Sequence, residues 1–118
     1  IAGQVPFWNG ELLHIGKVGE NYSVEDAVRA ARVSGLNIIA QAKAALDGDL
    51  DRIRRIAKVG GFVNCVTDFG QHPTVINGAS DLFVEVFGDV GKHARFAVGA
   101  GSLPMGVAVE VDAIIIVD

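Results

Sequence analysis

The chain has 118 residues, of which 50% are hydrophobic and 20% are charged, a composition typical of one globular domain. We therefore expect a single domain over residues 1–118. Its formal net charge of -4 is opposite in sign to the charge that attracts nucleic acid, so a nucleic-acid partner is not expected. The one cysteine, Cys65, excludes an intramolecular disulfide and is compatible with a reducing compartment, which favours a cytoplasmic location.

The apolar runs of the chain are short. The longest wholly apolar run, residues 113–117, is far shorter than the roughly 20 residues that span a bilayer, so no membrane partner is expected. The chain opens with Ile1 rather than Met and shows no basic and then apolar leader. We therefore expect a chain that is clipped at its N-terminus.

The first predicted element is an amphipathic helix that begins near Val24. Ser23 can cap its first turn, and the acidic residues at positions 25 and 26 complement the positive end of the helix dipole. Apolar residues then recur at spacings of three and four as far as Ala45, which predicts one buried face. The turn residues Asp47 and Gly48 should end this helix.

A strand and a second helix are expected in the middle of the chain. The strand should cover residues 54–66, where Gly60 and Gly61 indicate a bulge or a close approach of backbone. Basic residues cluster at 52–58, and such a cluster is usually a solvated strand edge. Pro73 is tolerated in the first turn of a helix and precedes a second apolar stripe, so we expect a helix from there to Gly88.

Two further strands are predicted near the C-terminus. From Gly106 onward the odd-numbered residues as far as Val117 are apolar, and this face should meet the helices. The opposite face carries Glu110 among apolar residues. In the strand over residues 94–100, Phe96 and Val98 are assigned to the core, which places Arg95 on the face away from the helices. The expected fold is therefore α+β, with two helices on one face of a sheet and a half-apolar face that favours self-association.

Arg95 is the strongest candidate for a binding role. Its neighbours on the same strand face, Ala97 and Gly99, are small and leave room for a planar ligand against the backbone. The guanidinium fork matches a carboxylate in a bidentate way. An ion pair with Glu110 or Asp112 of another subunit would explain the same pattern, and the sequence leaves both interpretations open.

The other polar candidates are also ambiguous. Glu110 could position water or exchange a proton, or it could simply neutralise an arginine. Asn77 lies within the second predicted helix, where a hydrogen bond to a ligand and plain exposure are both compatible with the pattern. Cys65 has no identifiable base near it in the sequence, so it is expected to be a small core residue. The three histidines share no metal-ligand spacing, so no metal site is expected.

Three separated motifs carry a resemblance to a known family. Residues 94–111 contain an arginine, then Leu-Pro, then an apolar-Glu-apolar strand, and residues 2–6 read Ala-Gly-Gln-Val-Pro. A third motif, Val75-Ile76-Asn77, places an asparagine on a helix. Together these motifs resemble the YjgF-type reactive-intermediate deaminase (Rid) family, also called the L-PSP endoribonuclease family, over nearly the whole chain.

The resemblance implies a homotrimer with a chorismate-mutase-like fold and three clefts between subunits. It also implies hydrolysis of 2-imino or 2-enamino acids to 2-oxo acids and ammonia, as in 2-iminobutanoate/2-iminopropanoate deaminases, without a metal or an organic cofactor. By motif position, Arg95 would bind the substrate carboxylate and Glu110 would position water. Asn77 and backbone groups near Gly3 and Ala97 would complete the substrate site.

The chain also departs from the family pattern. Ala97 stands where the family often has a cysteine, and the stretch between Pro6 and the first helix is longer than in the best-known deaminases. Family members begin earlier with a strand, which is either missing here or outside the given chain. Two other functions stay open: a non-catalytic trimer that binds small carboxylates such as 2-oxo acids, and an endoribonuclease, against which the negative charge and the lack of an evident histidine pair argue.

Overall fold

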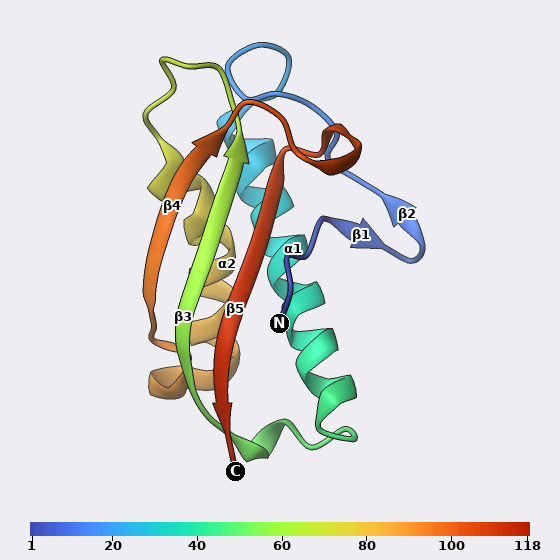
Figure 1. Ribbon diagram of the computed structural model, residues 1–118, viewed down its shortest axis with the longest axis vertical. Helices are drawn as coiled ribbons and strands as arrows, with labels where there is room; N and C mark the ends of the chain where they lie inside the picture. The colour runs from blue at the N-terminus through green and yellow to red at the C-terminus, as the bar shows by residue number, and fades with distance from the viewer.

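A three-stranded sheet with two helices on one face forms the body of the protein (Figure 1). The computed structural model describes residues 1–118. Two helices and three long strands follow a short N-terminal hairpin, and the expected α+β class is confirmed. The bounds are β1 (Phe7–Trp8), β2 (Glu11–Leu12), α1 (Val24–Ala45), β3 (Ile53–Asn64), α2 (His72–Phe87), β4 (Ala94–Ala100) and β5 (Val109–Val117).

The sheet has the strand order β4-β3-β5, so the longest strand lies in the middle. β3 is parallel to β4 and antiparallel to β5. The parallel pair is joined through α2, which crosses the sheet as parallel strands require. β4 and β5 therefore form the two sides of the three-stranded sheet, one on each side of β3 (Figure 1).

Both helices begin and end close to the predicted residues. Ser23 Oγ accepts a hydrogen bond of 3.1 Å from the Asp26 backbone N-H at the start of α1. After α1, Asp47 and Gly48 have φ values of 53° and 90°, and Gly88 ends α2 with a φ of 63°. Local capping and turn chemistry thus fixes the helix bounds. Neither helix is long and apolar enough to cross a membrane.

Gly60 and Gly61 mark close approaches rather than a bulge. A Cβ on Gly61 would clash with the side chain of Ile76 on α2, and a Cβ on Gly60 would clash with Asp112 and Phe96. The irregular pairings of β3 with β5 lie near the start of the strand, between positions 53 and 58. The two glycines therefore let α2 on one face, and side chains on the other, pack tightly against β3.

The two faces of β4 are the reverse of the expectation. Ala97 packs against the main core and Arg95 donates hydrogen bonds to α2, so both residues face the helices. Phe96 lies on the open face, where its ring meets that of Phe62 edge-to-face at 5.3 Å between centroids, and Val98 is 43% exposed. The expectation was wrong because little space exists beneath α2: a Cβ at Gly99 would lie 2.9 Å from Cys65 Sγ.

The two faces of β5 follow the prediction, except at the end of the strand. Val109 and Val111 are fully buried beneath the helices, whereas Val117 is 43% exposed. On the other face Glu110 is half-buried, and the exposed fractions of Ile114 and Ile116 are 61% and 51%. This open face is apolar enough that contact with another subunit would stabilise it.

The N-terminal residues form a hairpin that was not predicted. Asn9 and Gly10, with φ values of 51° and 79°, make the turn between β1 and β2, and Asn37 donates hydrogen bonds to the carbonyls of Val5 and Phe7. Before the hairpin, Gln4 exchanges two backbone hydrogen bonds with Val111. Gly3 therefore lies alongside β5.

Candidate functional site

Arg95 reaches from β4 to α2, where it contacts three residues of the helix. Its Nη1 donates to Asn77 Oδ1 at 2.7 Å and to Ser80 Oγ at 3.1 Å, and its Nη2 donates to the Pro73 carbonyl at 3.4 Å. The expected association of Arg95 with Asn77 thus occurs within one chain. All three acceptors are neutral groups.

Arg95 has no carboxylate partner within the chain. Each of the four ion pairs joins other residues, and Asp112 instead accepts a hydrogen bond from the Gly60 backbone N-H on the open face. Because its hydrogen-bond partners are all neutral, no bound carboxylate offsets the positive charge of this half-buried guanidinium, and the charge is available to an anion. A cavity of about 280 Å³ borders it, lined by Ser80, Asp81, Val84, Lys92, His93 and Arg95.

Two residues of this site, Ser80 and His93, were not identified from the sequence. Ser80 Oγ lies 2.9 Å from His93 Nε2, and His93 Nδ1 lies 2.6 Å from the Gly91 carbonyl oxygen. A signal did exist, since Ser80 follows Asn77 by three residues on a helix and His93 precedes Arg95 by two residues. Only the packing of α2 against β4 shows that the helix pair Asn77 and Ser80 meets the pair His93 and Arg95.

Gly3 and Glu110 form the second part of the predicted site. A Cβ on Gly3 would overlap the Glu110 carboxylate, so this carboxylate packs directly on the Gly3 backbone. Glu110 pairs with Phe62 across β3 and β5, which places it on the open face. The sequence predicted the association of Gly3 with Glu110 only through the family resemblance.

The predicted site residues therefore fall into two separate groups. The first group lies on the helix-covered side of the sheet, with Arg95 and Ala97 on β4 and Asn77 on α2. The second group lies at β5 on the open face, and it consists of Glu110 and Gly3. The middle strand β3 separates the two groups. One chain alone does not bring Arg95 and Glu110 together.

Cys65 is a core residue, as predicted, but it has a neighbour that the sequence did not reveal. Its side chain is 7% exposed, and its Sγ lies 3.6 Å from His72 Nε2. The end of β3 and the start of α2 bring the two residues together across a seven-residue separation. No group of three or more His, Cys, Asp and Glu residues could hold a metal ion.

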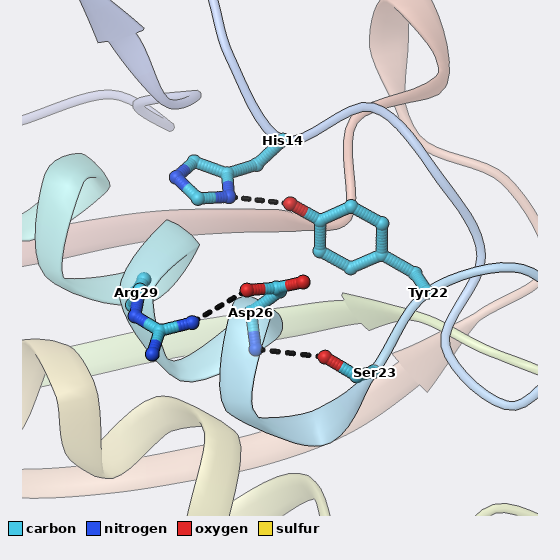
Figure 2. A network of polar contacts seen from close by, with 5 residues as sticks. All are labelled: His14, Tyr22, Ser23, Asp26 and Arg29. Atoms are coloured by element: carbon cyan, nitrogen blue, oxygen red, sulfur yellow. Dashed lines mark hydrogen bonds and ion pairs between the residues drawn. The ribbon is translucent and has the colours of Figure 1, made fainter.

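Further polar contacts lie where the loop before α1 meets the start of that helix (Figure 2). His14 Nδ1 and the Tyr22 hydroxyl share a hydrogen bond of 2.5 Å, and Asp26 pairs with Arg29. Burial lowers the pKa of His14 below its ordinary value of 6.5, although the nearby Asp26 opposes this shift. Burial also raises the pKa of the Tyr22 hydroxyl. His14 and Tyr22 are bonded to each other in the loop, Asp26 and Arg29 are bonded to each other on α1, and these side chains line no cavity, so we assign the contacts a structural role.

Two helices on a mixed sheet, with an arginine bound to a helix-borne asparagine, define an α+β protein of the chorismate-mutase-like class. The family model described as "YjgF/chorismate_mutase-like, putative endoribonuclease" matches residues 1–114. The chain belongs to this YjgF family, and the resemblance inferred from its motifs is confirmed.

Similar proteins come from distant organisms. Protein TCP17 of Trypanosoma cruzi is 45% identical over 116 residues, which are 98% of this chain and 72% of that protein. The crystal structure of Atu1372 from Agrobacterium tumefaciens, a protein of unknown function, superposes with a TM-score of 0.98 at 48% identity and covers 100% of this chain and 74% of the other. The YjgF gene product of E. coli superposes with a TM-score of 0.65 at 27% identity, with 98% and 76% of the two chains covered.

Proposed function

We propose that the protein is a hydrolase that converts 2-imino and 2-enamino acids to 2-oxo acids and ammonia. The reaction would take place in clefts between the subunits of a homotrimer. The observation that carries this proposal is Arg95, whose guanidinium borders a cavity and has hydrogen-bond partners that are all neutral. A substrate carboxylate would supply the negative charge that this guanidinium lacks.

The separation of the two groups of site residues supports a site shared between subunits. Glu110 and Gly3 lie on the other side of the sheet from Arg95, so a second subunit would have to present them to it. The open face with Ile114 and Ile116 exposed offers a surface for such contact. The complete site would then contain Arg95, Asn77 and the Ala97 backbone from one subunit, with Glu110 and the Gly3 backbone from the next.

The proposed reaction requires few catalytic groups. Water adds to the imine carbon, the resulting carbinolamine loses ammonia, and a 2-oxo acid remains. Arg95 would hold the carboxylate beside the reacting carbon, and Glu110 would accept a proton from the attacking water and return it to the leaving nitrogen. The reaction requires neither a protein nucleophile nor a redox step.

The test is ammonia release from 2-iminopropanoate, generated in situ by an amino-acid oxidase. Wild-type protein should accelerate release, and Arg95→Ala should reduce the acceleration at least tenfold through loss of the carboxylate contact, worth roughly 1.5–3 kcal/mol. Arg29→Ala is the matched control, because this arginine lies on the surface of α1 and pairs only with Asp26. Full activity in Arg95→Ala would refute the proposal.

A second candidate function is a trimer that binds small carboxylates such as 2-oxo acids without turnover. It is favoured by one observation: Arg95 hydrogen-bonds only neutral groups within the chain, so no carboxylate that could activate water is bound to it. Saturable, Arg95-dependent binding of pyruvate without any acceleration of ammonia release would select it. An endoribonuclease is less well supported, because the net charge is -4 and each histidine is hydrogen-bonded to a different group.

A further inference from the structure

With a neutral His93 ring, the hydrogen bonds around it have only one consistent set of directions. The Gly91 carbonyl can only accept, so His93 Nδ1 carries the hydrogen and donates it over 2.6 Å. In the neutral imidazole Nε2 is then an acceptor, and the Ser80 hydroxyl must donate to it over 2.9 Å. The lone pairs of Ser80 Oγ are left to accept from Arg95 Nη1 at 3.1 Å. The Gly91 carbonyl thus sets the direction of every bond up to the guanidinium.

The hydrogens of Arg95 can be assigned in the same way. A guanidinium has five N-H hydrogens: one on Nε and two on each terminal nitrogen. Asn77 Oδ1 and Ser80 Oγ take both hydrogens of Nη1, and the Pro73 carbonyl takes one hydrogen of Nη2. The hydrogen on Nε and the second hydrogen on Nη2 have no partner. A bidentate contact across the Nη1–Nη2 end of the fork would therefore break an existing bond of Nη1, whereas the Nε–Nη2 edge keeps an unpartnered hydrogen on each of its two nitrogens.

We propose that Ser80 and His93 are positioning residues that hold Nη1 of Arg95 and so select the Nε–Nη2 edge for the carboxylate of a 2-imino or 2-oxo acid. This inference rests on the proposed function in one respect, that Arg95 receives a carboxylate. It adds a defined contact edge and two residues that act through Arg95. Neither residue is required to touch the ligand.

The geometry also explains why an arginine and a serine are needed together. Without the Ser80 hydroxyl, one Nη1 hydrogen would be unpaired and the guanidinium could rotate to use its end for an anion. Without an acceptor at His93 Nε2, the Ser80 hydroxyl could turn its hydrogen toward Arg95 and repel it. A lysine at position 95 could not reproduce the arrangement, because an ammonium group has no second edge.

The first test measures pyruvate binding by calorimetry to the assembled wild-type protein and to matched variants. Ser80→Ala and His93→Phe should each weaken binding by roughly tenfold, since the first removes a hydrogen bond to the guanidinium and the second removes the acceptor that orients the Ser80 hydroxyl. Ser80→Thr and His93→Gln should restore affinity to within about threefold, because the hydroxyl and an acceptor near the Nε2 position are kept. Rescue by these conservative variants distinguishes positioning from a general effect on folding. Equal affinity in wild type, Ser80→Ala and His93→Phe would overturn the inference.

The second test locates the contact edge in wild-type protein. The Arg95 Nε-H signal in a proton–nitrogen NMR spectrum is assigned by its loss in Arg95→Lys, and pyruvate is then titrated. A saturable downfield shift of this proton is expected, because it gains a charge-assisted hydrogen bond. Arg95-dependent binding that leaves the Nε-H signal in place would overturn the inference while the proposed function stands. No pyruvate binding and no deaminase activity in the wild type would overturn both.

Discussion

Replacement of Gly3 by alanine should reduce activity without reducing stability. The new Cβ would overlap the Glu110 carboxylate, which must move away, and a flexible side chain can move at little cost. Gly3 does not have a positive φ, so alanine fits the backbone and can stabilise the folded state by about 0.4–1 kcal/mol through the unfolded chain. A displacement of about 1 Å in a group that orients water lowers a rate by up to roughly 100-fold.

The assay compares kcat for 2-iminopropanoate with the thermal midpoint of unfolding in the same samples. Gly70→Ala is the control, because a Cβ added at Gly70 would have no atom within 4 Å and the φ of this residue is not positive. We expect a fall in kcat of about tenfold or more for Gly3→Ala, with a midpoint equal to or above that of the wild type. Unchanged kcat in Gly3→Ala would refute the assignment of Glu110 to the reacting centre.

Three further predictions concern α1 and the loop before it. Ser34 Oγ is buried without a hydrogen-bond partner, so Ser34→Ala should raise the free energy of unfolding by about 1 kcal/mol, whereas Ser23→Ala removes a helix cap and should lower it by about 1 kcal/mol. Denaturant unfolding checks both signs, and a destabilised Ser34→Ala would contradict the first. Because the folded-state pKa of His14 lies below 6.5, the unfolded chain binds its proton more readily, and stability should fall as pH drops below 6.5 and through the folded-state pKa. His14→Gln should flatten this part of the profile of unfolding midpoint against pH, and an unchanged profile would contradict the assignment.

The sequence predicts the helices well because their ends depend on nearby residues. Ser23 caps α1 by accepting a hydrogen bond from the backbone N-H of Asp26, three residues later, and Gly88 ends α2 by adopting a positive φ. Such signals are complete within a few residues of chain. The hairpin formed at Asn9 and Gly10 carries an equally local signal, since this dipeptide is a preferred two-residue turn, so the sequence is sufficient to predict it.

Local signals of this kind do not predict which face of β4 meets the helices. Alternation shows that Arg95, Ala97 and Gly99 share one face, but not which face meets the helices. That choice depends on the space beneath α2, where a Cβ at position 99 would already crowd Cys65 and His72. Small residues on an edge strand thus have two possible explanations. They can lie on a face that packs closely beneath a helix, or on a face that is open to a ligand.

The reversed face changes how the arginine must work. On an open face Arg95 would be mobile, but against α2 it is held by Asn77, Ser80 and the Pro73 carbonyl. A guanidinium that is already ordered loses little side-chain entropy when an anion binds, so more of the contact energy remains for affinity. The same packing places Arg95 on the opposite side of the sheet from Glu110, so in the proposed site the preorganisation of Arg95 and the need for a second subunit would follow from one structural feature.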